Sequence, residues 1–193
     1  MHELLRSFAE CVHPDCTIDF ATVGSLLVLR AARSGEFLFR EGDIRDFVGI
    51  AQQGCLRSFF LNDGKEITLF FHLEQQTLGD YESMKRQQPA CFSCQAIEDS
   101  TVLIIDKQAL AAIEALPDGQ KLLRLVVEEL AFQLRDRLLS LYRDSPEERY
   151  TSFLELQPTP AKRISQQYIA SYIGVEPESL SRLKRRLRER AST

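Results

Sequence analysis

The feature that most restricts the fold is a segment near the C-terminal end with the spacing of two short helices that cross at a tight turn. Counting from Gln166 as position one, Ala170 falls at five, where only a small side chain lets the helices approach closely. Gly174 falls at nine, where the turn needs a left-handed backbone that glycine adopts at little cost. Aliphatic residues occupy the packing positions: Ile169, Ile173, Val175, Leu180 and Leu183. The pattern predicts a helix-turn-helix.

The second helix of this motif starts at Pro177, because a missing N–H costs nothing at the first helical position. Its exposed face offers polar and charged groups: Glu178, Ser179, Arg182, Arg185 and Arg186. An arginine can donate two hydrogen bonds to guanine, a glutamate can accept one from cytosine, and Ser and Arg can hold phosphates. Residues 160–193 carry a net charge of +5, although the whole chain carries −4. A basic end on an acidic body predicts contact with nucleic acid. The alternative is a helical hairpin whose charged face is only solvated.

Residues 28–106 have the pattern of short strands joined by tight turns. Two apolar-rich runs, 55–61 and 66–71, flank Asn62-Asp63-Gly64-Lys65, which predicts a β-hairpin because glycine tolerates the positive φ of such turns. Residues 91–97 and 101–106 repeat this pattern. Short strands at this spacing predict an antiparallel roll or barrel.

A long amphipathic helix is predicted for residues 119–143. Apolar residues at alternating steps of three and four form a coiled-coil-like seam, interrupted by Arg137: Leu123, Val127, Leu130, Leu134 and Leu141. A second apolar face is expected to cover the β domain: Leu122, Leu125, Val126, Phe132, Leu138 and Leu139. A helix with two apolar faces needs two partners, and the seam predicts pairing with the same helix of a second subunit. The alternative is a helix buried within one large domain.

A new helix is predicted to begin after Ser145. Pro146 suits the first helical position, and Glu148 lies three residues after the cap, as in a capping box. We therefore predict three parts: a sensor domain at 1–117, a dimerisation helix at 118–143 and a helix-turn-helix domain at 145–193.

This order of elements resembles the Crp/Fnr family of transcription regulators over nearly the whole chain. The resemblance rests on these segments: Gly35-Glu36, Glu41-Gly42-Asp43, Gly54 before a predicted strand, Asp63-Gly64-Lys65-Glu66, Glu98-Asp99-Ser100, residues 148–150, residues 169–174 and residues 177–182. It implies an α+β fold with a cyclic-nucleotide-binding-like antiparallel β-roll. It also implies a homodimer that binds a pseudo-palindromic operator. No nucleophile-and-base constellation, phosphate loop or paired-carboxylate motif stands out in the sequence, so an enzyme is not expected.

Carried over position by position, the resemblance makes Glu178 and Arg182 the base-reading residues. Pro177 falls where cyclic-AMP-responsive members have a base-reading arginine, so one contact is expected to be missing. Positions that touch the DNA backbone are matched by Gln166, Gln167, Ser179 and Arg185. The chain ends within a turn or two of the recognition helix, as in a short form of the family, which predicts weaker and more salt-sensitive binding.

The family's cyclic-nucleotide cassette is only partly matched. Gly79-Asp80 fits its Gly-Glu element, but Ala90-Cys91-Phe92 stands where the family has Arg-Ser-Ala, so Ala90 replaces the arginine that neutralises the cyclic phosphate and Cys91 follows it. The candidate ligand-binding residues are Gly79, Asp80, Ala90 and Cys91. A buried phosphate without a matching charge costs several kcal/mol, so we predict that cyclic AMP is not the effector. No cofactor is predicted, and the effector is left open.

The five cysteines leave a redox alternative open. Cys11 and Cys16 with Cys91 and Cys94 offer four thiolates for an iron–sulfur cluster, but their spacing differs from the family's and the last two are expected on opposite faces of a strand. We therefore predict no metal site. A cysteine-based redox-responsive regulator remains an alternative, as does a ligand-sensing or protein-interaction module with weakened DNA binding.

The remaining expectations concern partners and location. No apolar run approaches the roughly 20 residues that span a bilayer, and the N-terminal segment has no signal-peptide core, so a cytoplasmic protein is expected. The expected partners are double-stranded DNA, a second copy of the chain and RNA polymerase, with no membrane.

Overall fold

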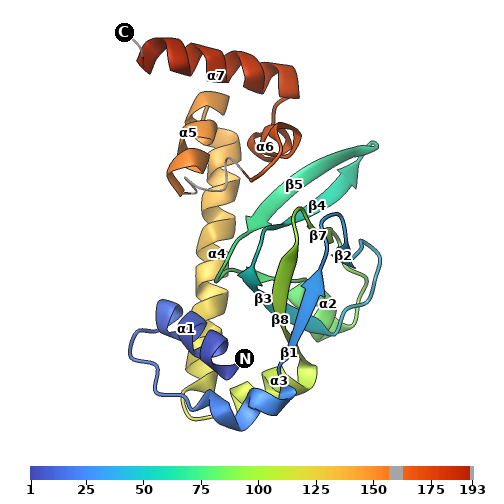
Figure 1. Cartoon of the computed structure of the whole chain (residues 1–193), viewed down its shortest axis with the longest axis vertical. Helices are drawn as coiled ribbons and strands as arrows, with labels where there is room; N and C mark the ends of the chain where they lie inside the picture. Colours follow the sequence, from blue (N-terminus) through green and yellow to red (C-terminus); the bar gives the residue numbers. More distant parts are fainter. Residues whose placement is uncertain (157–162, 192–193) are drawn as a thin grey trace.

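The computed structural model describes residues 1–156 and 163–191, arranged along one long helix (Figure 1). A β-roll and the N-terminal helix flank this helix, α4 (Gly119–Arg143), and three shorter helices lie at its C-terminal end. Lys162, one of the basic residues counted above, lies outside the described residues.

Within the described residues, the β-roll is built from two four-stranded sheets. The strands are β1 (Val28–Ala32), β2 (Phe37–Phe39), β3 (Phe47–Gln53), β4 (Leu56–Asn62), β5 (Lys65–His72), β6 (Thr77–Leu78), β7 (Ser93–Ala96) and β8 (Ser100–Asp106). Their orders are β1-β8-β3-β6 and β2-β7-β4-β5, and every pairing is antiparallel. The predicted antiparallel roll in an α+β fold is confirmed.

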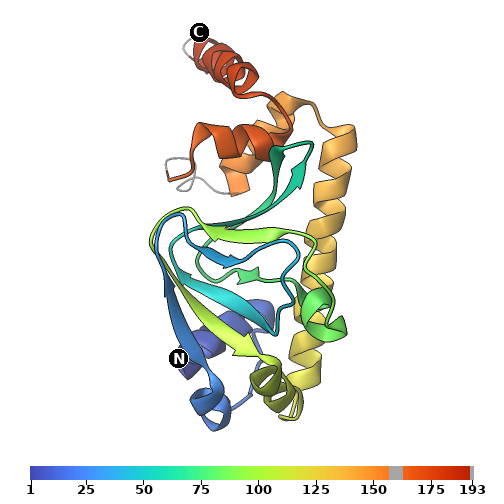
Figure 2. The ribbon, with the colours of Figure 1, turned by 90° about the vertical axis from the view of Figure 1, so that its right-hand side faces the viewer.

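The β4–β5 hairpin forms at the predicted turn. Asn62 pairs with Lys65, and the two residues between them, Asp63 and Gly64, have φ of 50° and 77°. Two consecutive positive φ values give a turn whose twist matches that of the flanking strands, and Asp-Gly adopts it readily. The hairpin reaches out of the roll towards the C-terminal helices (Figure 2).

The helices complete the fold. They are α1 (His2–Val12), the 3-10 helix η1 (Phe20–Leu26), α2 (Tyr81–Arg86), α3 (Lys107–Glu114), α4, α5 (Pro146–Leu156), α6 (Gln166–Ile173) and α7 (Pro177–Ala191). The first part of α4 is held in an apolar cluster with α1, α3 and β8, in which Leu5, Phe8, Ile105, Leu110 and Leu122 are buried. This cluster joins the long helix to the roll.

The structure shows how far each of the two predicted apolar faces of α4 is buried. Most of the seam is open to solvent: Val127, Leu134 and Leu141 have exposed fractions of 46%, 56% and 44%. Leu123 is instead half-buried against the N-terminal cluster.

The prediction that the second face covers the β domain is wrong for its C-terminal half. Leu122 is buried and Val126 packs on the N-terminal cluster, but Phe132, Leu138 and Leu139 are exposed. The physical reason is that α1 and α3 contact only the beginning of the helix. Periodicity shows that a face is apolar and does not show how far along the helix its partner extends.

The helix predicted to begin after Ser145 is present as α5, and its N-terminal cap forms as predicted. The Ser145 backbone N–H donates to Glu148 Oε2 at 2.7 Å, and the Glu148 N–H donates to Ser145 Oγ at 3.3 Å, which completes a capping box. The helices beyond it share a buried cluster with the β4–β5 hairpin, in which Phe71 packs with Phe153 and Ile169. The C-terminal helices are therefore docked on the β-roll, and the three-part division stays a prediction.

Candidate nucleic-acid interface

Helices α6 and α7 form the predicted helix-turn-helix. Ser165 caps α6 by accepting from the Tyr168 N–H at 3.3 Å, and Gly174 ends it with φ 74° and ψ 41°, the left-handed conformation expected for the turn. The Val175 N–H then donates to the Ala170 carbonyl at 3.0 Å. The turn depends on one residue for which positive φ is easy.

Side-chain size explains how closely the two helices pack. Ala170 has an exposed fraction of 0% and lies in the cluster that contains Ile169, Leu180 and Leu183, so a larger side chain there would meet packed neighbours. The predicted packing residues Ile169, Ile173, Leu180 and Leu183 are all buried, and Val175 is half-buried. The core of the motif therefore holds α7 at a fixed angle to α6.

The predicted DNA-contact residues gather on the opposite surface. Ser179 is half-buried, and the other six are exposed to solvent: Gln166, Gln167, Glu178, Arg182, Arg185 and Arg186. A hollow of about 310 Å³ is lined by Ser179, Arg182, Arg185 and Arg186. Arg182 Nη2 donates to Ser179 Oγ at 3.2 Å, so these two side chains already lie against each other. An open, basic helix face can present guanidinium groups to an anionic partner.

Lys184, one of the basic residues near the C-terminal end, lies beside the candidate interface residues. Its Nζ donates to Gln166 Oε1 at 2.7 Å, which ties the start of α6 to the middle of α7. Burial, with the nearby charge of Arg188, lowers the pKa of the Lys184 ammonium from its ordinary value. Lys184 therefore positions Gln166.

Two arginines hold the C-terminal end of α6 against α4 and α5. Arg137 donates to the Tyr172 carbonyl, and its guanidinium carbon lies 3.9 Å from the centroid of the Tyr172 ring. Arg149 donates to the carbonyls of Ile173 and Asp144. These groups satisfy carbonyls that a helix end leaves without internal partners. Burial lowers the pKa of Arg137. Its interruption of the apolar seam was the one sequence signal of this role.

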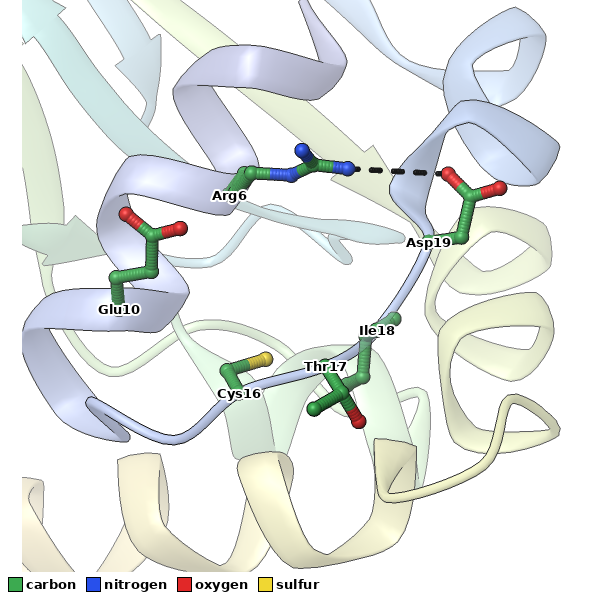
Figure 3. Close-up of a pocket in the computed structure, with 6 residues that line it drawn as sticks. All are labelled: Arg6, Glu10, Cys16, Thr17, Ile18 and Asp19. Atoms are coloured by element: carbon green, nitrogen blue, oxygen red, sulfur yellow. Dashed lines mark ion pairs between the residues drawn. The ribbon is translucent and has the colours of Figure 1, made fainter.

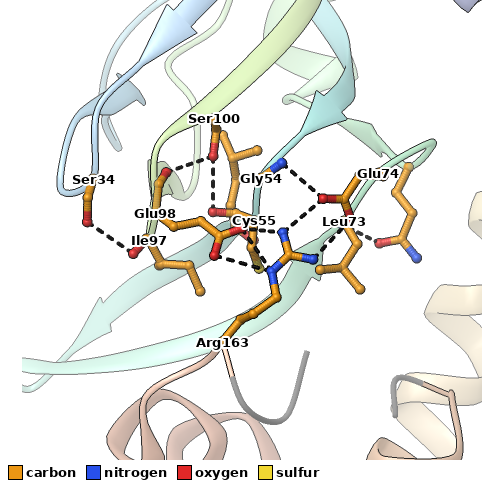
Figure 4. A network of polar contacts seen from close by, with 11 residues as sticks. Ser34, Gly54, Cys55, Leu73, Glu74, Ile97, Glu98, Ser100 and Arg163 are labelled. Atoms are coloured by element: carbon orange, nitrogen blue, oxygen red, sulfur yellow. Dashed lines mark hydrogen bonds and ion pairs between the residues drawn. The ribbon is translucent and has the colours of Figure 1, made fainter. Parts of the chain in front are cut away.

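Arg163, which precedes α6, joins the motif to the β-roll (Figure 4). Its guanidinium donates to Glu74 Oε1 at 2.8 Å and to both Glu98 oxygens, with Nε–Oε1 at 3.0 Å. Glu74 also accepts from the Gly54 N–H at 3.0 Å. The hydrogen bond from Arg163 lowers the pKa of Glu74. One cation thus bridges the loop after β5 and the turn before β8.

The hairpin supplies a second set of contacts to α6. Ser171 Oγ donates to the Glu66 carbonyl at 2.7 Å and accepts from the Thr68 N–H at 2.9 Å. The Tyr168 ring stacks on the guanidinium of Arg57. Arg57 is buried, with an exposed fraction of 1%. Residues about 100 positions apart therefore meet here, which is why sequence patterns did not reveal them.

The four candidate ligand-binding residues also lie close together, but the Asp80 carboxylate already accepts hydrogen bonds from within the protein. Asp80 is buried and caps α2 through the Ser83 N–H at 2.9 Å, and its other oxygen accepts from the Cys91 N–H at 3.3 Å. Ala90 is buried, and Gly79 has φ 120°. Ala90 belongs to the apolar cluster that contains Phe39, and Phe92 packs against this cluster with its ring centroid 5.7 Å from that of Phe39. Asp80 therefore has a structural role in this region.

The cysteine pair differs from the prediction in one respect. Cys91 is exposed and lies ahead of β7, whereas Cys94 is buried within it, because the strand begins only at Ser93. Burial raises the pKa of the Cys94 thiol to about 12, which disfavours the thiolate. Among the described residues, no three His, Cys, Asp or Glu side chains gather in a way that could hold a metal ion.

A smaller hollow of about 200 Å³ lies at the other end of the molecule, beside α1 (Figure 3). It is lined by Arg6, Glu10, Cys16, Thr17, Ile18 and Asp19. Arg6 reaches across to Asp19 at 3.9 Å, between two well exposed side chains. An exposed pair of this kind contributes little, and the hollow is remote from the basic face of α7.

A β-roll, a long helix and a helix-turn-helix with an open basic face define the architecture of a one-component regulator, and comparison with known proteins agrees. The sequence profile of the cyclic nucleotide-binding domain matches residues 29–115. The transcriptional activator protein Anr of Pseudomonas protegens is 30% identical over 173 residues, covering 83% of this chain and 70% of Anr. The chain belongs to the Crp/Fnr family of regulators.

Solved structures show the same fold. FixK2 from Bradyrhizobium japonicum matches with a TM-score of 0.70 and 21% identity, over 86% of each chain. The c-di-GMP-responsive global regulator CLP of Xanthomonas campestris matches with a TM-score of 0.70 and 15% identity, over 90% of this chain and 93% of CLP. Within residues 1–156 and 163–191, no helix combines the length and the apolar character needed to cross a membrane.

Proposed function

We propose that this chain is a sequence-specific DNA-binding transcription regulator that acts as a homodimer. The observation that carries the proposal is the exposed face of α7, where Arg182, Arg185 and Arg186 stand together on a helix held at a fixed angle by the Gly174 turn. A helix of this kind enters the major groove and meets base edges with its N-terminal residues.

The proposed contacts to DNA are of two kinds, those that recognise base edges and those that hold phosphates. Arg182 can donate two hydrogen bonds to guanine O6 and N7, and Glu178 can accept from cytosine N4. The remaining residues of the face hold phosphates: Gln166, Gln167, Ser179, Arg185 and Arg186. Because Arg182 already touches Ser179, a phosphate contact at Ser179 orients the reading arginine.

The homodimer is proposed to form through α4. The exposed apolar side chains Val127, Leu134 and Leu141, with half-buried Leu123 and Leu130, would pair with the same helix of a second copy. Two recognition helices about 34 Å apart would then fit successive major grooves of a pseudo-palindromic operator. RNA polymerase is the proposed further partner, and the cytoplasm, where genomic DNA is found, is the proposed place of action.

An effector other than cyclic AMP is proposed for the β-roll. Asp80 accepts hydrogen bonds from within the protein, and Ala90 and Cys91 offer no charge to a cyclic phosphate. A signal from the roll would reach the helix-turn-helix through the docked β4–β5 hairpin and shift the placement of the two recognition helices.

The test is selection from a randomised duplex pool by the full chain, with sequencing of the bound fraction. We expect a palindromic motif with half-sites about one helical turn apart. Arg182→Ala should reduce discrimination between this motif and random DNA by about 1–3 kcal/mol. Arg6→Ala, a change remote from α7, serves as the control. If Arg182→Ala discriminates as the wild type does, the assignment of α7 as the reading helix is wrong.

A wild-type protein that enriches no motif and binds no duplex would favour the alternative of a ligand-sensing or protein-interaction module. Iron or a visible absorption band in anaerobically purified protein would favour a redox-responsive regulator.

A further inference from the structure

The tip of the β4–β5 hairpin meets the end of α7 at which the recognition helix begins (Figures 1 and 2). Lys65 Nζ lies 2.7 Å from Glu176 Oε1, and the two side chains have exposed fractions of 70% and 67%. Glu176 directly precedes α7, and its carbonyl accepts from the N–H groups of Ser179 and Leu180. A lysine of the β-roll therefore stands beside the N-terminal end of the recognition helix.

The position of this lysine is built into the docked hairpin. Ser171 of α6 bonds the backbone of β5 at Glu66 and at Thr68, one and three residues beyond Lys65. The stacking of Tyr168 on Arg57 holds the neighbouring strand, β4, against the same helix. The hairpin and the helix-turn-helix are thus fixed to each other within a few residues of the tip.

The first turn of α7 has no basic side chain of its own. Glu176 and Glu178 are acidic, and the exposed basic side chains of the helix begin only at Arg182, a turn later. The DNA backbone carries one negative charge per roughly 1.7 Å of helix axis. The first residues of a recognition helix lie in the groove between two phosphate chains, so a group beside Glu176, such as Lys65 Nζ, would lie within reach of phosphates when α7 enters the groove. Lys65 adds a positive charge at the position where α7 itself has none.

We propose that Lys65 is a DNA-phosphate contact supplied by the β-roll, with Glu176 and Ser171 as its positioning residues. The ligand is the phosphate backbone of double-stranded DNA next to the half-site that α7 reads. The inference rests on the proposed function and extends it, because it makes the sensor domain part of the DNA interface. A shift of the hairpin would then alter DNA affinity directly.

The experiment measures binding of wild type and Lys65→Gln by fluorescence anisotropy over a range of salt concentrations. Two duplexes of equal length are used, one with the enriched motif and one with a scrambled sequence. Lys65→Gln should weaken binding to both duplexes by a similar factor. It should also reduce the slope of log K against log salt by about 0.9 for each bound subunit, with the preferred motif unchanged.

Lys121→Gln is the matched control. It makes the same change of charge on an exposed lysine in the first turn of α4. Along the helix this position is ~24 Å from Arg137, which contacts the helix-turn-helix. The control should leave the salt slope as in the wild type.

A double variant separates contact with phosphate from simple shielding of Glu176. If Lys65 only neutralises that carboxylate, Lys65→Gln/Glu176→Gln recovers the wild-type affinity and slope, and the proposal is overturned. If Lys65 touches phosphate, the slope of the double variant stays shallow. Ser171→Ala should lower the slope in the same way, and it should add nothing when combined with Lys65→Gln.

The outcomes also separate this inference from the proposed function. A wild-type protein that binds neither duplex overturns both. A wild type that binds with a salt slope unaffected by Lys65→Gln overturns the role of Lys65 alone. Unchanged thermal unfolding of the variants shows that the exposed substitutions have not altered the fold.

Discussion

The guanidinium carbon of Arg57 lies 3.8 Å from the centroid of the Tyr168 ring, so a strand of the β-roll and the first helix of the helix-turn-helix share one buried cation. Phe59 lies on the same guanidinium at 4.0 Å, and Nη2 donates to Glu66 at 2.5 Å and to Gln95 at 2.9 Å. Among the described residues, the buried Nη1 atom has no hydrogen-bond partner. Packing of rings therefore has to compensate for lost hydration at this contact.

Removing the Tyr168 ring should weaken the docking of α6 on the hairpin. We expect Tyr168→Leu to lower the free energy of unfolding by about 1–2 kcal/mol, because a desolvated cation loses the face of an aromatic ring. Tyr168→Phe keeps the ring and should differ from wild type by less than about 0.5 kcal/mol. Urea denaturation measures both. Equal losses for Leu and Phe would show that the ring face is not what stabilises the contact.

The turn of the helix-turn-helix should be sensitive to a single methyl group. At Gly174 an added Cβ would have Arg149 Nη2 as its nearest neighbour at 3.8 Å, so there is space for it, but φ is +74°. Gly174→Ala should therefore cost about 1–2 kcal/mol of unfolding free energy through backbone conformation alone. Gly174→Asn should cost less, since asparagine visits this region more readily. If both variants are as stable as wild type, the turn has another conformation in solution.

Stability should fall on acidification because of His72. Its Nδ1–H donates to the Thr77 carbonyl at 2.8 Å and its Nε2 accepts from Ser58 Oγ at 2.8 Å, which fixes the neutral ring. Burial lowers the pKa of His72 from 6.5 to about 4. The unfolded chain therefore takes up a proton first, and the free energy of unfolding should decrease as pH falls from 6.5 to 4, by up to about 3 kcal/mol.

The measurement is urea denaturation at several pH values, compared with His72→Gln. The variant should lack the part of the pH dependence that lies between pH 6.5 and 4. A variant whose profile runs parallel to that of the wild type across this range would contradict the assignment to His72.

The apolar seam of α4 should control assembly. Leu134 and Phe132 are similarly exposed, at 56% and 51%, but they lie about 160° apart around the helix axis. Leu134→Asp places a charge in the proposed dimer seam and should shift the protein to monomer, whereas Phe132→Asp should leave the dimer intact. Sedimentation velocity distinguishes the two species. If Phe132→Asp dissociates the dimer and Leu134→Asp does not, the interface lies on the opposite face of the helix.

Cyclic AMP should not bind the β-roll. Because both Asp80 oxygens accept hydrogen bonds from the protein and Ala90, at the position expected for the family's arginine, carries no charge, we expect a bound cyclic phosphate to have no counter-charge there. Calorimetric titration with cyclic AMP should give no heat of binding, and the thermal midpoint should stay constant. Micromolar affinity would show that another residue neutralises the phosphate.

Local chemistry accounts for the predictions that the structure confirms. Gly174 ends α6 in the left-handed region, Asp63-Gly64 forms the two-residue turn, and Ser145 caps the helix that starts at Pro146. In each case the preference belongs to a few adjacent residues, so it can be recognised before any tertiary contact is known. The apolar periodicity of α4 is of the same kind.

Tertiary structure decided which surfaces meet. Arg57, Arg163 and Lys65 look like ordinary charged residues in the sequence. Arg57 and Lys65 of the β4–β5 hairpin meet Tyr168 and Glu176, and Arg163 meets Glu98, only because the β-roll folds against the C-terminal helices 65 or more positions away. The same holds for α4, where the apolar period predicted two covered faces but α1 and α3 cover only its first turns. The sequence by itself determined the elements and their turns, because backbone preferences are local. Long-range packing determined how the reading helix is held, because the contacts that hold it are formed between distant parts of the chain.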